Sequence, residues 1–200
     1  NLGDLFGFGF PVTFKGLEVI VTIICVVGVI NALNLIDGID GLCGALCLIT
    51  SASILTIVKL KGASASIALI LYFSSALVAF LLVNLGFTRR FIGKVFLGDT
   101  GTTIIGFFLS WFLIKLSNGS ETVLRPICAV WILAIPIMDT LSVMIRRLLR
   151  NQSPFLPGRD HIHHLLQELG LSSRATLLAI IFFAVLLAGI GVGCEIREVS

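Results

Sequence analysis

The chain has 200 residues, of which 57% are hydrophobic and only 12% are charged, and its formal net charge is +3. Soluble domains carry about 25% charged residues, so this composition excludes an ordinary soluble domain and indicates a membrane protein. A membrane β-barrel would need short segments of alternating polarity, which the sequence lacks. We therefore expect helices, because lipid offers no partner to free backbone groups.

Apolar runs divide the chain at regular intervals. Five of them approach the roughly 20 helical residues that a membrane core requires, and a sixth reaches that length only with its threonine-rich start. We predict an all-α, multi-pass membrane helix bundle in which residues 1–200 form one domain with six transmembrane helices. The predicted spans are 17–36, 42–60, 65–87, 102–116, 126–145 and 175–194.

The first predicted span ends in the polar stretch "NALNLIDGIDGL", residues 31–42. Its spacing of three places Asn31, Asn34 and Asp37 on one helix face, whereas Asp40 rotates away unless the helix ends before it. Carboxylate and amide oxygens are ligands that Mg²⁺ takes. The alternative is a helix end that is polar only because it emerges into water.

A second polar stretch, "KVFLGDTGTT", residues 94–103, opens directly into the fourth span. The N–H groups at a helix start attract anions, and Gly98 and Gly101 would let the backbone approach a phosphate closely. Asp99 lies where it could hold a metal ion that bridges phosphates. The alternative is that Asp99 only caps the helix.

The one long polar interval, 146–174, contains every histidine of the chain. A start at Asp160 and a stop at Gly170 predict a short helix over 161–169. One side of that helix is an apolar stripe, which indicates packing against the bundle or the membrane surface. The stripe consists of Ile162, Leu165, Leu166 and Leu169.

The opposite face of this short amphipathic helix carries His161, His164 and Glu168, which we expect to point toward the polar site. His163 lies one step round the helix and is expected to matter least. A zinc site is the weaker interpretation, because no cysteine is near and the spacing is not that of a zinc motif. Contact of the histidines and Arg159 with a phosphate is favoured.

The three polar segments should lie on one side of the membrane if successive helices alternate in direction. Of the 14 basic residues, eight then lie on that side and six on the other. The dense basic clusters are all on the first side, which the positive-inside rule makes cytoplasmic. The eight are Arg89, Arg90, Lys94, Arg146, Arg147, Arg150, Arg159 and Arg174; the six are Lys15, Lys59, Lys61, Lys115, Arg125 and Arg197.

Taken together, these motifs resemble the polyprenyl-phosphate N-acetylhexosamine-1-phosphate transferases, which are glycosyltransferase family 4. The stretches that carry the resemblance are "NALNLIDGIDGL", "VFLGDTGT", "PIMDT" and "SPFLPGRDHIHHLL". The last is most similar to the branch that uses UDP-N-acetylglucosamine and undecaprenyl phosphate.

The resemblance implies that N-acetylhexosamine 1-phosphate, in this branch N-acetylglucosamine 1-phosphate, passes from a UDP-sugar to undecaprenyl phosphate with release of UMP. It implies dependence on Mg²⁺ or Mn²⁺ and a location in the bacterial cytoplasmic membrane, with the active site on the cytoplasmic face. The product would serve cell wall, lipopolysaccharide or O-antigen synthesis. The implied partners are the nucleotide sugar, the lipid phosphate and the bilayer, with no nucleic acid; a homodimer stays open.

The resemblance also assigns roles to residues. Asp99 and Asn34 would bind the metal, and Asp37 and Asp40 would complete an acidic catalytic site. A catalytic role at the diphosphate falls to the histidine stretch, through His161, His163, His164 and Arg159.

Three further residues would bind the UDP-sugar. Phe96 matches a residue that stacks on uracil, although an aromatic side chain at the membrane interface is the alternative. Asn84 would contact the nucleotide, and Gly98 would admit a phosphate to the backbone.

One departure from the family pattern concerns completeness. The family carries an Asp-Asp pair on an earlier cytoplasmic loop, and this chain has none; about four or five upstream helices are absent too. We therefore expect either the C-terminal portion of a longer enzyme or a chain that is inactive as it stands.

Other functions and mechanisms stay open. An ion-coupled transporter could relay protons through Asp37, Asp40 and Asp139, but such relays lie near mid-membrane and these residues lie at helix ends, with Asp139 somewhat deeper. A non-catalytic scaffold would not need the glycine turn or the histidines. Within the transferase reading, direct attack by the lipid phosphate is favoured over a covalent aspartyl intermediate.

Overall fold

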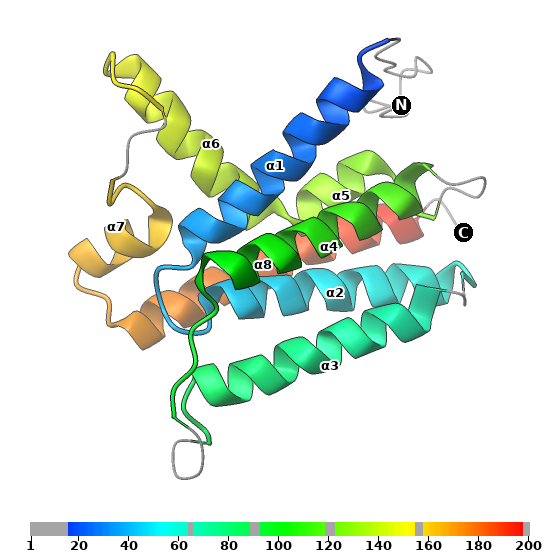
Figure 1. The fold of residues 1–200 in the computed structure, drawn as a ribbon, viewed down its shortest axis with the longest axis horizontal. Coiled ribbons are helices and arrows are strands. Elements are labelled where there is room, and N and C mark those ends of the chain that lie inside the picture. The colour runs from blue at the N-terminus through cyan, green and yellow to red at the C-terminus, as the bar shows by residue number, and fades with distance from the viewer. Residues whose placement is uncertain (1–15, 64–65, 89–92, 119–122, 155–157, 198–200) are drawn as a thin grey trace.

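The computed structural model describes residues 16–63, 66–88, 93–118, 123–154 and 158–197 (Figure 1). Within these ranges the chain forms eight helices and no strand. They are α1 (Glu18–Ile36), α2 (Leu42–Leu60), α3 (Ile67–Asn84), α4 (Gly98–Asn118), α5 (Pro126–Ile132), α6 (Ala134–Leu149), α7 (Ile162–Glu168) and α8 (Ser173–Ile196).

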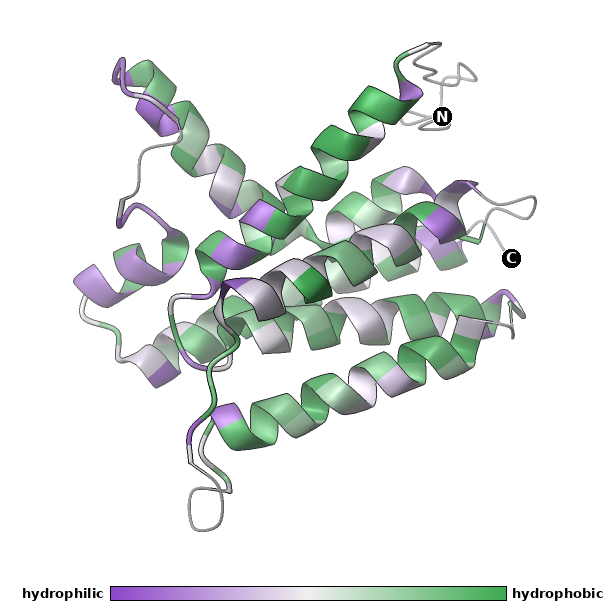
Figure 2. Ribbon diagram, in the orientation of Figure 1, coloured by the Kyte–Doolittle hydropathy of each residue, from purple (hydrophilic) through white to green (hydrophobic). Residues whose placement is uncertain are grey.

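Five of these helices, α1, α2, α3, α4 and α8, are long and apolar enough to cross a membrane. The pair α5 and α6 makes a sixth candidate if it is counted as one bent span. Figure 2 shows that hydrophobic residues cover most of these helices. The prediction of an all-helical membrane bundle with about six spans is confirmed, and the chain is an integral membrane protein.

The predicted span 126–145 is wrong in one respect, because it is not a single straight helix. The chain breaks at Leu133, and α5 and α6 meet at an angle of 82°. In Figure 1 the axes of α2, α3, α4 and α8 are roughly aligned, while α1 and α6 diverge from each other, and α2 packs on α3 and α8. α1 packs chiefly on α4, and the short α5 packs on α8.

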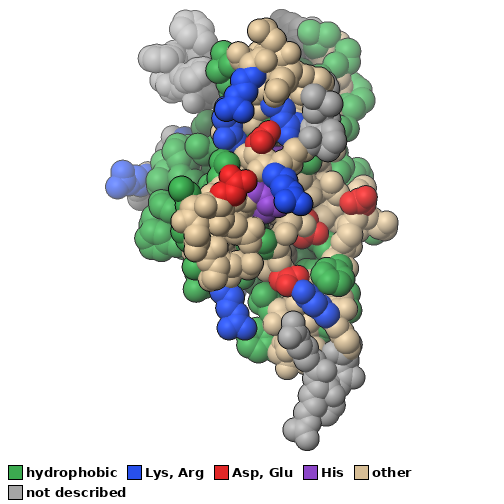
Figure 3. Space-filling model, turned by 90° about the vertical axis from the view of Figure 1, so that its left-hand side faces the viewer, with side chains coloured by type: hydrophobic (Ala, Val, Ile, Leu, Met, Phe, Trp, Pro, Cys, Tyr) green, Lys and Arg blue, Asp and Glu red, His purple; other side chains and the backbone are tan. Residues whose placement is uncertain are grey.

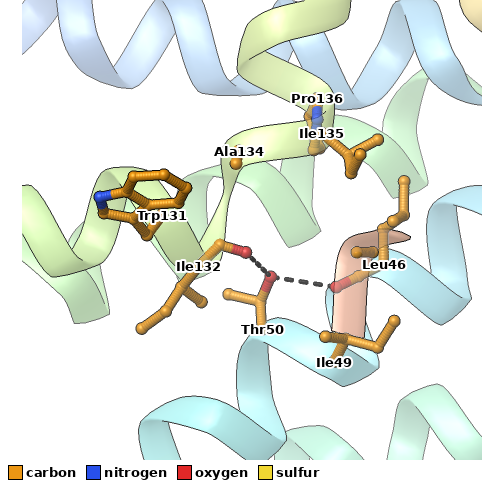
Figure 4. Close-up of a pocket in the computed structure, with 9 residues that line it drawn as sticks. Leu46, Ile49, Thr50, Trp131, Ile132, Ala134, Ile135 and Pro136 are labelled. Carbon is orange, nitrogen blue, oxygen red and sulfur yellow. Dashed lines mark hydrogen bonds between the residues drawn. The ribbon is translucent and has the colours of Figure 1, made fainter. Parts of the chain in front are cut away.

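The break between α5 and α6 follows from Pro136. Proline has no N–H, so the carbonyl of Ile132, four residues earlier, loses its helical donor. The hydroxyl Oγ1 of Thr50 on α2 lies 3.5 Å from that carbonyl oxygen and 3.0 Å from the oxygen of Leu46 (Figure 4). A side chain of the neighbouring helix therefore supports the polar group that the break exposes.

The two faces of α6 differ in polarity in the sense expected of a membrane helix. Its inward face buries Asp139 and Arg147, which are 7% and 6% exposed. Its outward face is apolar, with residues three or four apart in the sequence. These are Met138, Leu141, Ile145 and Leu148.

A buried ion cluster joins three helices at the end of the bundle where α8 finishes. Glu195 of α8 is 1% exposed, and its carboxylate forms an ion pair with Lys61, which follows α2. The backbone N–H of Arg125, just before α5, donates to Glu195 Oε2 at 3.0 Å, and Nε of Arg125 lies 3.5 Å from the same oxygen. A buried carboxylate needs such partners, so the cluster fastens α2, α5 and α8 together.

We predict that Thr50→Val destabilises the protein by about 1 kcal/mol, because the Ile132 carbonyl then loses its neighbouring donor. Thr56→Val is the matched control, since Thr56 on the same helix is exposed and bonds only to Ala52 within its own helix, at 2.8 Å. Thermal unfolding in detergent measures both. Equal losses of stability in the two variants would contradict the support of the break by Thr50.

Candidate active site

The polar segments of the chain meet at the end of the bundle where α1 finishes and α4 and α8 begin. Figure 3 views the molecule from this side: histidine is visible between acidic and basic side chains, with hydrophobic side chains at the flanks. The short helix α7 contacts α8 here. In the described part of the chain the polar segments therefore lie together at one end of the bundle, as the alternation of helix directions predicts.

The first contact at this end joins α1 to α4 through Asn34. Its amide Nδ2 donates to Asp99 Oδ1 and to Thr102 Oγ1, both at 3.0 Å. Asn34 is half-buried and Asp99 is exposed at the first turn of α4. The two residues predicted to share a metal ion are therefore direct neighbours, although 65 positions separate them in the sequence.

The acidic turn after α1 carries the next two carboxylates. α1 ends at Ile36, so Asp37 is its C-terminal cap and Asp40 lies beyond the helix. Burial raises the pKa of Asp37, and the nearby charges of Asp40 and Asp99 raise it further. Asp37 therefore holds a proton more readily than an ordinary aspartate, whereas Asp40 turns outward to an ion pair with Lys94.

Asn84 braces two loops of the site. It is 4% exposed at the end of α3, its Oδ1 accepts from the N–H of Gly41 at 2.7 Å, and its Nδ2 donates to the carbonyl of Val95 at 2.8 Å. These bonds fasten the acidic turn to the segment that leads into α4. A contact of Asn84 with a nucleotide stays a prediction.

The segment before α4 presents an aromatic ring and a glycine. Phe96 is 69% exposed, so its ring is accessible at the edge of the site. Gly98 begins α4 with φ of +64°, a left-handed value that side-chain-bearing residues rarely adopt. Glycine is thus required to turn the chain into the helix beside Asp99.

Asp139 of α6 caps and orients α7. Its Oδ1 accepts from the backbone N–H of Ile162 at 2.7 Å, and its Oδ2 lies 2.8 Å from Nδ1 of His161. The expectation that Asp160 caps this helix is wrong: His161 is the N-cap residue, and the carboxylate of Asp160 is bonded to Arg147. The cap comes from another helix, which a local sequence pattern does not reveal.

His163 is the most buried of the three histidines, at 1% exposed, and its rank as the least important for activity stays a prediction. Its ring lies against the backbone of Gly38, where an added Cβ would be 2.0 Å from Nε2. A glycine is needed at that position for the close approach. The centroids of the His163 and His164 rings are 4.1 Å apart, so the histidines form one cluster beside the acidic turn.

The outer parts of the histidine segment are more exposed than predicted. Leu169, placed in the apolar stripe, is 78% exposed, because α7 ends at Glu168. His164 is half-buried, and Arg159 is exposed next to Asp160. Arg159 is thus accessible to a ligand, but its predicted contact with a diphosphate stays a prediction.

Two arginines at the end of α6 hold this segment, and sequence reasoning counted them only as basic charges. Arg146 donates to the backbone carbonyl of Asp160 at 2.6 Å. Arg147 donates through Nε to Asp160 Oδ2 at 3.1 Å and through a terminal nitrogen to the carbonyl of Pro154 at 3.3 Å. The pattern that could have revealed them is an Arg pair one turn from a loop rich in proline and glycine.

A family model described as glycosyl transferase family 4 matches residues 2–117, which is more than half of the chain. The chain belongs to this family. The resemblance drawn from its motifs is thereby confirmed. The matched range includes the acidic turn and the start of α4, while the histidine segment lies beyond it.

Curated relatives of this family 4 chain carry the name undecaprenyl-phosphate alpha-N-acetylglucosaminyl 1-phosphate transferase. The protein of Escherichia coli (strain K12) is 44% identical over 122 residues, and that of Salmonella typhi is 43% identical over 122 residues. Each match covers 60% of this chain and 33% of the relative. The protein of Pasteurella multocida (strain Pm70) is 42% identical over 127 residues, or 62% of this chain and 35% of the relative. The chain thus spans about a third of the length of these relatives.

The oxygen donors of the family 4 chain fit a magnesium ion that a substrate helps to hold. Among the described residues no group of three His, Cys, Asp or Glu side chains is close enough to form a complete cage. Mg²⁺ commonly takes only one or two carboxylates and completes its shell with water and phosphate. The charges of Asp40 and Asp99 both raise the pKa of Asp37. The three carboxylates thus concentrate negative charge, which suits a cation.

We predict that His163 makes stability depend on pH. Burial lowers its pKa from 6.5 to about 4, with His164 and His161 acting in the same sense and Asp139 in the opposite one. Between about pH 6.5 and 4 the unfolded chain therefore binds a proton that the folded chain does not, so stability falls as the pH falls through this window. The melting temperature measured from pH 8 to 4 should decline below about pH 6.5.

The variant His163→Leu isolates this contribution, because titrating groups common to both proteins cancel in the comparison. Its melting temperature should decline less than that of the wild type over the same range. His164→Leu is the control and should keep most of the decline, because burial, the largest cause of the lowered pKa of His163, is retained. Parallel curves for wild type and His163→Leu would refute the prediction.

Proposed function

We propose that the protein of which this chain forms part transfers N-acetylhexosamine 1-phosphate, most simply N-acetylglucosamine 1-phosphate, from a UDP-sugar to undecaprenyl phosphate and releases UMP. Membership of glycosyl transferase family 4 and the activity named for the relatives support this proposal. The single observation that carries it is the contact of Asn34 with Asp99. That contact joins two motifs of the sequence beside two further carboxylates and the histidine cluster.

The reaction needs positioning and neutralisation of charge more than covalent chemistry by the protein. An oxygen of the lipid phosphate attacks the sugar-bearing phosphorus of the donor, a new P–O bond forms, and the bond to the UMP oxygen breaks. Any proton on the attacking phosphate passes to a base, and the half-buried carboxylate of Asp37 in the acidic turn is the candidate for that role. Direct attack is the simpler of the two routes, since it needs no aspartyl intermediate.

The metal proposed for this site is Mg²⁺ or Mn²⁺, held by Asp99 with Asn34 beside it. When bound, such an ion neutralises the phosphate oxygens and draws the two anions together. Asp37 adds negative charge beside it, and Asp40 adds less because its carboxylate is paired with Lys94. The N–H groups at the start of α4, opened by Gly98, offer hydrogen bonds to a phosphate.

The remaining predicted residues are assigned by their place in the structure. Phe96 offers an exposed ring to the base of the donor, and Asn84 holds the loop that carries this ring. His161, His163 and His164, with the exposed Arg159, form the side of the site that would meet the diphosphate. A homodimer is a separate proposal, and the roles assigned to these residues do not require a second copy of the chain.

We further propose that the site faces the cytoplasm of a bacterial cell and that the protein lies in the cytoplasmic membrane. The basic residues at the end of α6 and in the segment after it support this orientation under the positive-inside rule. UDP-sugars are made in the cytoplasm, so a donor site on that face has direct access to its substrate. The product would enter a cell-surface polysaccharide such as a cell wall polymer, lipopolysaccharide or O-antigen.

We predict that Asp99→Asn lowers UMP release by orders of magnitude, because the change keeps the shape of the side chain and removes its charge. The assay supplies UDP-N-acetylglucosamine, undecaprenyl phosphate and Mg²⁺ to membranes that contain the protein as the cell makes it. Glu168→Gln is the control, because it also removes one negative charge. Glu168 is exposed at the end of α7. Activity near the wild-type level in Asp99→Asn would exclude Asp99 as the principal metal ligand.

We predict opposite accessibility for cysteines introduced at the two ends of the bundle. Gln152 lies in the segment after α6, at the site end, and Asn118 ends α4 at the other; both are exposed. In a background without the exposed Cys25 and Cys194, an impermeant maleimide applied to spheroplasts should label Asn118→Cys at once. It should label Gln152→Cys only after the membrane is opened, and the reverse order would invert the proposed orientation.

A further inference from the structure

Lys94 is a basic residue that neither the motifs nor the proposed chemistry uses. It lies in the segment before α4 and is partly buried, with 28% of its side chain exposed. Its ammonium forms an ion pair with Oδ2 of Asp40 and lies 4.8 Å from the centroid of the Phe96 ring. One side chain therefore contacts both the acidic turn and the exposed aromatic ring.

The backbone around Lys94 is fixed independently of these contacts. The carbonyl of Val95, between Lys94 and Phe96, accepts from Asn84, which also binds the N–H of Gly41. The segment and the acidic turn are thus already held side by side by their main chains. What Lys94 adds is control of two side chains, the carboxylate of Asp40 and the ring of Phe96.

The position of the ammonium over the ring limits how Phe96 can rotate. A cation near a ring face is attracted by its electron density, so the ring is held with that face toward Lys94. Phe96 is nevertheless 69% exposed, which leaves ring surface accessible to another group. A planar heterocycle could stack there without displacing any protein contact, and the orientation of the ring would already be set.

We infer that Lys94 is a positioning residue of the nucleotide site, which orients Phe96 for stacking on the base of the donor and holds Asp40 away from the donor's diphosphate. This inference rests on the proposed function, because it takes the donor to be a nucleoside diphosphate sugar. The ion pair withdraws the negative charge of Asp40 from an anionic ligand. Loss of Lys94 would therefore release the ring and expose the charge together.

The chain supplies a matched control in Lys115. Its ammonium lies 5.2 Å from the centroid of the Trp111 ring, a comparable cation–π contact near the other end of α4. Removing Lys115 deletes a positive charge and a cation–π contact of the same kind. It does so near the other end of α4, far from the acidic turn. General effects on helix stability or membrane insertion should therefore be common to both lysines.

The test measures binding of UDP by titration calorimetry and the KM for UDP-N-acetylglucosamine, with the whole protein in detergent or nanodiscs. Lys94→Met should weaken UDP binding and raise KM by about three- to tenfold, in keeping with one exposed cation–π contact and one exposed ion pair, while kcat changes much less. Lys94→Arg should restore most of the affinity, because arginine makes both contacts. Lys115→Met should leave both quantities unchanged.

A second comparison identifies the route through the ring. In a Phe96→Leu background, Lys94→Met should cost less UDP affinity than it does in the wild type, because the ring that Lys94 orients is gone. Full additivity of the two changes, or unchanged UDP affinity in Lys94→Met, would overturn the inference. A fall in kcat with KM unchanged would also overturn it, since Lys94 would then act on the reacting phosphates.

The binding arm separates this inference from the proposed reaction. If no UMP is released by the wild type but UDP binds and Lys94→Met weakens it, the transfer reaction fails and the nucleotide site stands. If the wild type binds no UDP at all, the inference is overturned whatever the activity toward other donors.

Discussion

The cost of placing charge in hydrocarbon governs the whole arrangement. Charged and amide groups cannot lie along the lipid-facing length of a helix without partners, so in this chain they collect at helix ends or in buried pairs. Asp37, Asp40 and Asp99 lie just beyond or just inside such ends. Since every turn at one end of the bundle faces the same side of the membrane, the requirement that removes charge from the lipid also concentrates it in one place. A site for phosphates follows from topology before any single contact is considered.

Within that constraint, α6 does more than cross or line the bundle. Asp139 caps α7 and orients His161, while Arg146 and Arg147 at its end hold the segment that leads into α7. α6 and the histidine segment are therefore held together as one unit, which follows α5 at Leu133 and packs on α1 and α8. The contact of His163 with Gly38 is where this unit meets the acidic turn.

Much of this could be predicted from sequence, for identifiable reasons. Span lengths follow from the thickness of the membrane, and polar ends stand out against apolar runs, so α2 and the convergence of the polar segments were accessible to reasoning. The pairing of Asn34 with Asp99 came from the family resemblance. The bend was not, although Pro136 was visible. Many membrane helices tolerate proline, and the outcome here depends on Thr50, 86 positions earlier in the sequence, lying next to the exposed carbonyl.

The histidine segment shows the same limit more sharply. Helical periodicity placed His163 one step round the helix from its neighbours, but it describes one helix alone and does not predict burial against another segment. Its burial is set by the approach of α7 to Gly38, which is a property of the assembled bundle. Likewise aspartate is a common helix N-cap residue, but the carboxylate of Asp160 binds Arg147. The N–H of Ile162 at the start of α7 donates to Asp139 instead. Local rules fail at these residues because their partners are tertiary.

The ion cluster at the opposite end of the bundle bears on how the protein is made. Lys61 and Arg125 are translated well before Glu195. Both cations therefore lack this carboxylate as a partner until α8 has been translated. The carboxylate is buried only when α2, α5 and α8 are packed together, and the cluster then holds the start of the seven-residue α5 beside the end of α8. Closure of the cluster thus depends on all three of these helices being packed together. A chain interrupted before Glu195 would leave Lys61 and Arg125 without this carboxylate, and α2 and α5 without the ionic contact that joins them to α8.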